Sequence, residues 1–388
     1  MILRTAWASL YARKSSVLLT ITALCISFCL LFSVEHIRQQ AKDSFYRSVS
    51  GVDLIVAARS SQMHVLLHSV FQIGHATNLV SLSRLEQLQQ DERVAWAIPL
   101  SYGDSYQGFA VVGTQANFFE HFRYADKRAL KFSEGQVFDD HQSMGAVFGA
   151  KVAQSLGVSL NNQLVVSHGS HKHSFTHHDE HPFEVVGILA PTGTAIDQSI
   201  YVSLDAIDEV HNNQTQGLSA ILLGVSSKFS LLTLQRDINQ ASDEALSAII
   251  PGVALAELWK MLSVIENILL VLAFLVLLAS ILGLAVLVLS SIHQRRNEFA
   301  VMRTIGASSA FIFALIQFEV LLLGLIALAL STILMMSVIW LMQDYLINHY
   351  GIQVSAQIIT ETNATIAAGI IIGLVVVACL PAWQATRK

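Results

Sequence analysis

This sequence has few cysteines and no phosphate-binding loop of the GxxxxGK[ST] type. The chain of 388 residues contains only three cysteines, Cys25, Cys29 and Cys379, and all of them fall inside long apolar runs. The segment between the first and second runs therefore has no internal disulfide, and its roughly 220 residues must be stabilised by their own core. No GxxxxGK[ST] loop is present, so any ATP that the protein depends on must be bound by another chain.

Charge is also scarce. Charged residues make up 13% of the chain and hydrophobic residues 53%, a balance that suits a membrane protein with a water-soluble domain. The net charge of −5 gives no indication of nucleic-acid binding. The segment between the runs has neither a nucleophile elbow nor an HExxH motif, so we predict a chain that is not itself an enzyme.

Four apolar runs are long enough to cross a bilayer as helices, at about 1.5 Å of rise per residue. They cover residues 17–34, 268–292, 311–341 and 364–380. We predict an α-helical membrane protein with four transmembrane helices (one plus three), stalk helices, and a large α+β extracytoplasmic domain between spans one and two. A cleaved signal peptide is the alternative for the first run, but no small-residue cleavage site follows it, which favours a retained anchor.

Basic residues orient these spans. They precede the first span, join the second to the third and follow the fourth: Arg4, Arg13, Lys14, Arg295, Arg296, Arg303, Arg387 and Lys388. The positive-inside rule places them in the cytoplasm and the long insert outside. We therefore predict a multi-pass membrane protein with its large domain outside, and the cysteine-free insert is compatible with a place in the periplasm, on a protein of the bacterial inner (cytoplasmic) membrane. Its parts are 1–34 (an amphipathic helix and span one), 35–257 (a stalk and the periplasmic domain) and 258–388 (a second stalk and three spans).

The insert alternates between helical and extended patterns. Apolar residues at every third or fourth position extend both span one and the start of span two outward, and this pattern predicts two stalk helices. Between them we expect, among other elements, a helix over 79–90 that Ser81 or Ser83 caps and a helix over 146–156. We also expect a hairpin of strands 164–167 and 183–189 with a histidine-rich loop at its tip.

The segment 293–308, between spans two and three, is basic and amphipathic. It predicts a short helix at the membrane surface. We expect Phe299, Met302 and Ile305 to face the bundle or the lipid, and Arg295, Arg296 and Arg303 to face water. From its charge alone, a loop that only sets the topology is the alternative.

This segment resembles the FtsX-like permease family, which includes the MacB-type exporters and the lipoprotein-releasing permeases. The family pattern is roughly R-x-x-E-[IF]-[AG]-x-[LM]-[RK]-x-[LIV]-G-A-[ST], and it is matched by Arg295, Glu298, Phe299, Ala300, Met302, Arg303, Ile305, Gly306, Ala307 and Ser308. The resemblance extends to Glu319 in span three, to the terminal P-A-x-x-A at 381–385 and to the one-plus-three layout. It is weaker at 185–194, in the external domain.

The resemblance implies the permease subunit of an ABC transporter. Its partners would be a separate cytoplasmic ATPase, which holds ATP and Mg²⁺, a second permease protomer (identical or related), membrane lipid and a periplasmic protein. Residues 293–308 would be the coupling helix that docks this ATPase, through Arg295, Arg296, Glu298, Phe299, Met302, Arg303, Gly306 and Ala307.

Force transmission is the function that this layout suggests. ATP hydrolysis by the partner would move the external domain through the stalks and so move or release a substrate, which could be metal-linked, at the outer face of the inner membrane. The alternative is a membrane-anchored regulator that uses the same motion to switch an extracytoplasmic hydrolase. A transport or release assay separates these two hypotheses.

Glu319 is a carboxylate within the third span, where an ionisable group is costly. We expect it to make a contact in the bundle interior or at a dimer interface that changes during the cycle. The alternative is a residue that its neighbours hold near the membrane surface. We expect no proton relay, because the sequence places no charged partner at a similar depth in the other spans.

Histidines gather in one short external stretch, among Asp179 and Glu180: His168, His171, His173, His177, His178 and His181. Neutral imidazole is a good ligand for zinc, copper or nickel, so a regulatory or substrate-linked metal site is one hypothesis. The alternative is a polar loop that binds metal only adventitiously.

Overall fold

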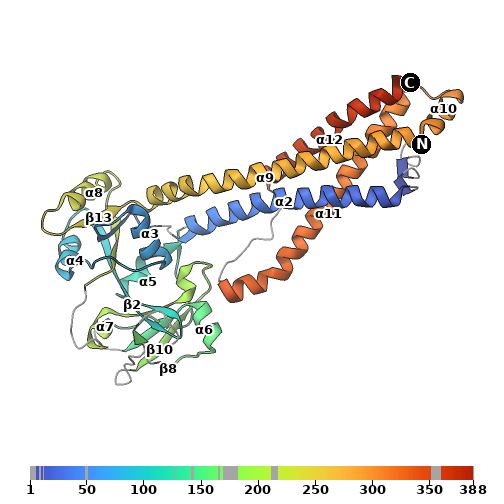
Figure 1. Cartoon of the computed structure of the whole chain (residues 1–388). Helices are drawn as coiled ribbons and strands as arrows, with labels where there is room; N and C mark the ends of the chain where they lie inside the picture. Colours follow the sequence, from blue (N-terminus) through green and yellow to red (C-terminus); the bar gives the residue numbers. More distant parts are fainter. Residues whose placement is uncertain are drawn as a thin grey trace. The chain divides into compact units, whose positions relative to one another are not determined.

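The structure is a computed structural model that describes residues 6–7, 10–11, 13–48, 51–125, 127–140, 144–164, 167–168, 182–210, 217–350 and 360–387. Its internal contacts divide the chain into two compact units, which we describe separately (Figure 1). One unit contains the residues up to Gln40, Ser263–Asp344 and the residues from Val354 onward. The other is mainly Ala41–Leu262.

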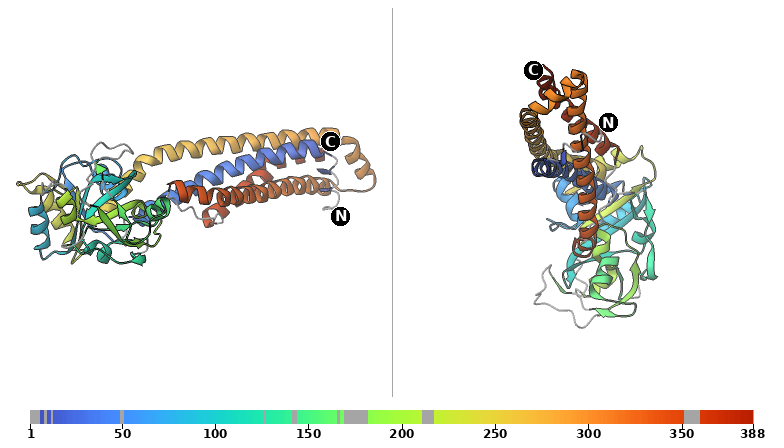
Figure 2. Two further views of the ribbon diagram at one scale, coloured as in Figure 1. Left: turned by 90° about the horizontal axis from the view of Figure 1, so that it is seen from below. Right: turned by 90° about the vertical axis from the view of Figure 1, so that its right-hand side faces the viewer.

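Long helices make up the first unit. α2 (Lys14–Ser48), α9 (Pro251–Gln294), α11 (Ser309–Tyr350) and α12 (Glu361–Arg387) are each long and apolar enough to cross a membrane. The short helix α10 (Arg296–Thr304) joins α9 to α11. The four long helices pack against one another in this unit (Figure 2), and they confirm the four predicted spans in their one-plus-three arrangement.

The core of this bundle takes side chains from all four long helices. Phe28 of α2, Leu284 of α9, Ile316 of α11 and Leu374 of α12 are all buried in it. Small residues let the backbones approach one another, because a Cβ on Gly324 of α11 would lie 2.7 Å from the Leu374 side chain. The bundle is therefore held mainly by close packing of apolar side chains.

A mixed sheet forms the centre of the second unit. Its strands follow the order β13 (Leu246–Ile249), β1 (Leu54–Ala58), β12 (Ala220–Val225), β2 (Val94–Tyr106), β3 (Phe109–Thr114), β11 (Ser199–Ser203), β7 (Gly145–Phe148), β10 (Phe183–Leu189), β6 (Phe132–Gly135). The first half of the long strand β2 pairs with β12 and its second half with β3. This strand therefore links two halves of the domain, each with its own helices.

The short strands lie beside this order. β8 (Gln163–Leu164) pairs with β10, β9 (Ser167–His168) pairs with β2, and β4 (Arg123–Tyr124) pairs with β5 (Arg128–Ala129). Around the second half of the sheet lie α5 (Asn117–His121), α6 (Ala150–Leu156), α7 (Leu204–Val210) and the 3₁₀ helix η1 (Ala195–Gln198).

Helices cover both faces of the first half, which explains why β1 is apolar throughout. Leu54 and Val56 point into a cluster with α4 (Leu82–Gln89) and α8 (Leu231–Gln240). Ile55 and Ala57 point the opposite way, into a cluster with α3 (Gln62–Phe71) and the first turns of α9. The predicted large α+β domain between spans one and two is therefore confirmed.

Some local predictions hold and others are wrong. Ser81 caps α4, since its hydroxyl accepts a hydrogen bond from the Arg84 backbone N–H. The helix expected over 146–156 is wrong in its first residues, which form strand β7. A short apolar run does not distinguish a strand from a helix, and the helix begins only after Gly149, where the chain passes too close to Ile196 for a side chain.

The expected hairpin is only partly correct. Phe183 of β10 lies opposite Leu164 of β8, as predicted. The chain then leaves this pairing, because His168 of β9 lies opposite Asp104 of β2. The segment before the histidine-rich loop thus forms two short strands that pair with different neighbours. Alternating hydrophobicity indicates that a segment is a strand, but not which strand it pairs with.

Candidate functional site

The segment expected to be the coupling helix is α10, and its two ends are built differently. It begins directly after Arg295, whose side chain makes no capping bond to the backbone. It ends in a Schellman motif, in which the N–H of Ala307 bonds to the carbonyl of Met302 and the N–H of Gly306 to that of Arg303. This motif needs φ of +105° at Gly306, a conformation that L-residues rarely adopt. The helix end therefore depends on glycine.

The residues of α10 divide into buried and exposed sets. Phe299 is buried in the bundle core, and Met302 packs against the same core. Arg296 and Glu298 are exposed, whereas Arg303 is half-buried and donates a hydrogen bond to the carbonyl of Ala385 in α12. The exposed residues offer a polar surface to a partner, while the buried ones attach the helix to the bundle.

The expectation that Arg295 faces water is wrong, because its side chain is only 9% exposed. Its Nε donates to Glu298 at 2.9 Å and its Nη1 to Glu319 at 2.9 Å. Its guanidinium also lies over the Phe299 ring, 4.9 Å from the centroid. Amphipathic periodicity assigns a charged side chain to the water-facing side, and it does not foresee a buried carboxylate from another helix.

Glu319 therefore has charged partners, contrary to expectation. Besides Arg295, it accepts a hydrogen bond from Arg13 Nη2 at 3.2 Å. Arg13 precedes α2 by one residue, so both cations lie just outside the apolar runs in which we sought partners. The positive-inside rule had assigned Arg13 and Arg295 to the same predicted side of the membrane, and this was the one signal that could have suggested them as partners of Glu319. The contact that we expected for Glu319 to change during the cycle stays a prediction.

A groove of about 810 Å³ lies between the ends of α9 and α12 and the side of α10. Its lining includes His293, Arg296, Arg303 and Trp383, and among the described residues that line it none is acidic. The groove is therefore basic, with apolar walls from Leu289, Ile292 and Phe299. Such a surface complements an acidic or phosphate-bearing partner.

The predicted metal ligands lie mostly outside the described residues. This applies to His171, His173, His177, His178 and His181, and for His168 the structure gives the backbone only. Within the described part of the chain, no group of three His, Cys, Asp or Glu side chains is placed to hold a metal ion. The loop therefore stays a prediction from the sequence.

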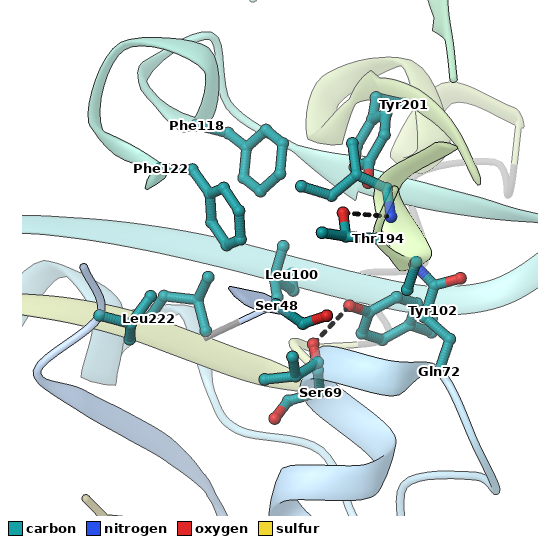
Figure 3. A pocket seen from close by; sticks show the side chains of 14 residues that line it. Ser48, Ser69, Gln72, Leu100, Tyr102, Phe118, Phe122, Thr194, Tyr201 and Leu222 are labelled. Atoms are coloured by element: carbon teal, nitrogen blue, oxygen red, sulfur yellow. Dashed lines mark hydrogen bonds between the residues drawn. The ribbon is translucent and has the colours of Figure 1, made fainter. Parts of the chain in front are cut away.

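A small cavity lies in the external unit (Figure 3). Phe118, Phe122 and Tyr201 line one side of it, and Tyr102 donates a hydrogen bond to the Ser69 carbonyl at 2.8 Å. Its volume of about 30 Å³ admits about one or two water molecules. Ligand pockets measure about 300–1,000 Å³, so this cavity is not a substrate site.

His68 of α3 is buried beside this cavity. It meets the Tyr102 ring edge-on, at 5.2 Å between centroids, and stacks against His64. Its Nε2 has no hydrogen-bond partner among the described residues. Burial lowers the pKa of His68 below its ordinary value of 6.5, and the nearby His64 and His75 lower it further.

This lowered pKa predicts a pH-dependent local stability. The opened state of α3 takes up a proton near pH 6.5 and the closed state only at lower pH. The stabilisation is therefore complete above pH 6.5 and is lost as the pH falls through the folded-state pKa. Hydrogen exchange of the α3 amides, corrected for intrinsic rates, should show this loss over about pH 5–7. His68→Phe should remove it and the exposed control His75→Gln should retain most of it; an unchanged slope in His68→Phe would contradict the assignment.

The fold and the site define a class of protein. The chain is a multi-pass membrane protein whose large external domain lies between its first and second spans, and a basic helix follows the second. The model of the MacB-like periplasmic core domain matches residues 17–241, and that of the FtsX-like permease C-terminal region matches residues 270–388.

The chain therefore belongs to the FtsX-like, MacB-type family of ABC transporter permeases. Such permeases are not themselves catalytic; the family works with a cytoplasmic ABC ATPase and forms dimers. These matches confirm the resemblance that the sequence suggested.

Two solved structures are similar to about half of the chain. The extracellular domain of the noncanonic ABC-type transporter YknZ from Gram-positive bacteria is 14% identical, with a TM-score of 0.34, over 51% of this chain and 98% of that one. The periplasmic region of MacB from Actinobacillus actinomycetemcomitans is 11% identical, with a TM-score of 0.38, over 55% and 97%. No curated protein sequence matches the chain.

Proposed function

We propose that this chain couples ATP hydrolysis by a separate cytoplasmic ATPase to movement of its own external domain. The movement would shift or release a substrate at the outer face of a bacterial inner membrane. ATPase docking on α10 would start the movement, and the two helices that enter the external domain would carry it outward. A second permease protomer, identical or related, would give each pair of stalks a partner to act against.

The observation that carries this proposal is the length and continuity of α2 and α9. They have 35 and 44 residues without a break. At 1.5 Å per residue they measure about 52 and 66 Å, whereas the hydrocarbon core of a bilayer is about 30 Å thick. Each helix therefore extends well beyond the membrane, and a continuous helix transmits displacement along its axis better than a loop does.

The outer parts of both helices are anchored in the external unit. Ala254, Leu255 and Trp259 of α9 are buried in the core that also contains β1 and α3. Ala41 of α2 packs against this core, and Lys42 Nζ lies 5.7 Å from the centre of the Trp259 ring. Movement of either stalk would therefore act on the packed interior of the domain.

Internal hydrogen bonding in the bundle argues against a polar channel through one protomer. Ser27 bonds to Ser280 at 2.6 Å, and the hydroxyls of Thr20 and Ser331 bond to carbonyls of their own helices. These hydroxyls are thus bonded within the bundle instead of lining a path. This supports action on a substrate that is already at the outer side.

Reconstitution tests the proposal directly. The full chain and a candidate cytoplasmic ABC ATPase from the same organism are purified together and placed in liposomes. We expect a stable complex, ATP hydrolysis that the chain stimulates, and transport or release of a substrate. Stimulated hydrolysis without transport, but with ATP-dependent activation of an external hydrolase, would favour the regulator alternative. Absence of any complex would contradict both.

The histidine-rich loop supports a separate prediction, derived from the sequence alone. The full chain in detergent should bind zinc near neutral pH and lose it as the imidazoles become protonated at about pH 5–6. Alanine replacements at His171, His173, His177 and His178 should remove most of this binding, whereas His75→Ala and His121→Ala together should retain it. No zinc binding by the unmodified chain would contradict the prediction. Retained transport after loss of binding would identify an adventitious site.

A further inference from the structure

A buried group of charges connects three segments at the cytoplasmic end of the bundle. Glu319 of α11 accepts two hydrogen bonds. Its Oε1 accepts one from Arg295 Nη1 at 2.9 Å, and its Oε2 accepts one from Arg13 Nη2 at 3.2 Å. Both carboxylate oxygens are thus used, each by a different guanidinium. The side chains of Glu319 and Arg295 are 9% exposed and that of Arg13 is 17% exposed.

The surroundings of these charges are apolar. Leu10, Val17, Val288, Phe299 and Val320 lie around the same point, and the void between them is about 10 Å³. A space of this size is at the lower limit for one water molecule, so water contributes little to solvating the charges. The three side chains therefore depend on one another, because a buried charge without its partner is strongly disfavoured.

Each partner of Glu319 belongs to a different moving part of the proposed mechanism. Arg295 is the residue at which α9 ends and α10 begins, and it also binds Glu298 in the first turn of α10. Arg13 lies one residue before α2, which is the first stalk helix. A carboxylate on α11 is therefore the common attachment point of the coupling helix and the cytoplasmic end of the first stalk.

We propose that Glu319 is a positioning residue for coupling, which fixes the start of α10 and the start of α2 to α11 so that they move together. This inference rests on the proposed function, and it adds the route by which a push on α10 reaches α2. With the carboxylate removed, a docked ATPase would still move α10. The displacement would then be lost between α10 and the start of α2.

The test uses the complete complex of the chain with its ATPase in liposomes. Glu319→Gln keeps the size of the side chain and removes its charge, and Arg13→Gln removes the link between Glu319 and the start of α2 while Arg295 stays in place. Ser27→Ala is the matched control, since it removes a buried contact between α2 and α9 that does not involve α10. For each variant we measure ATPase binding, the ATP hydrolysis rate, and substrate moved per ATP hydrolysed, all relative to the assembled complex.

We expect Glu319→Gln and Arg13→Gln to bind the ATPase and hydrolyse ATP like the unmodified chain. Substrate moved per ATP should fall by at least about fivefold in both variants, the lower end of typical coupling factors. Ser27→Ala should keep the normal ratio. A purely structural role would lower the amount of complex but leave the ratio per complex unchanged.

Two results would overturn the inference. One is a normal ratio in Glu319→Gln and Arg13→Gln. The other is loss of ATPase binding in Glu319→Gln, which would place the residue in docking and not in transmission. Failure of the proposed function itself would be visible separately, as absence of ATPase binding or transport by the unmodified chain.

Discussion

Replacing Gly306 by alanine is expected to reduce ATPase stimulation to near the basal level of the isolated ATPase. Gly306 ends α10 with φ of +105°, and a Cβ there would meet nothing within 4 Å. The penalty is therefore conformational and not steric, and it amounts to about 1–2 kcal/mol for an L-residue in a left-handed conformation. Relief of this strain would undo the Schellman motif and displace the docking surface. The rate of ATP hydrolysis by the reconstituted complex measures the effect.

Gly283 provides the matched control. It lies inside α9, and a Cβ there would also meet nothing within 4 Å, but its backbone is not in the left-handed region. Gly283→Ala should leave stimulation unchanged, because alanine is favoured over glycine in a helix by about 1 kcal/mol. Equal stimulation in both alanine variants would show that the end of α10 is not part of the docking surface.

The double variant Met261→Gly and Val264→Gly, in the second stalk, should nearly abolish transport while ATP hydrolysis continues. Met261 and Val264 of α9 are 68% and 61% exposed, so shortening them removes little core packing. Each glycine costs about 1 kcal/mol of helix stability relative to alanine and creates a flexible point. Motion that starts at α10 would then be absorbed before it reaches the external domain. Transport and hydrolysis are measured together in the same liposomes.

The double variant Met261→Ala and Val264→Ala is the control for the lost side chains. It removes the same exposed apolar surface but preserves the helix, so it should transport like the unmodified chain. If the alanine and glycine pairs lose transport equally, the side chains bind a partner or lipid, and stiffness of the stalk is not the cause. If neither pair loses transport, the second stalk does not carry the movement.

Spans and stalks could be predicted from the sequence because each is a long periodic pattern. The apolar runs predicted membrane-spanning helices. Apolar residues at every third or fourth position beyond two of these runs predicted that the helices continue outward, as α2 and α9 do. A serine cap, Ser81 or Ser83, was predicted for the same local reason, since a hydroxyl before a helix satisfies a free N–H, and Ser81 is the one that caps α4. These features depend on neighbours within a few residues.

Contacts between distant residues could not be predicted in this way. Arg13 and Glu319 are 306 positions apart, and beyond the side of the membrane predicted for Arg13 no pattern in either segment indicates the other. Charge alone assigned Arg295 to water, whereas a carboxylate from another helix binds it inside the bundle. Strand β7 was misread because four buried apolar residues fit both periodicities. These residues form a strand because β7 pairs with β10 and β11, and that pairing depends on the fold of the whole domain.

The central claim is that ATP moves the external domains, and a spin-label distance tests it most directly. The three cysteines lie in α2 and α12, so a cysteine-free chain can be made without touching the external domain, and Leu232→Cys then adds one label on α8, at a side chain that is 65% exposed. Pulsed electron paramagnetic resonance measures the distance between the two labels of a dimer, with the ATPase present and with or without ATP. The account predicts a distance distribution that shifts when ATP is bound and returns after hydrolysis. An unchanged distribution in a complex that hydrolyses ATP would contradict it.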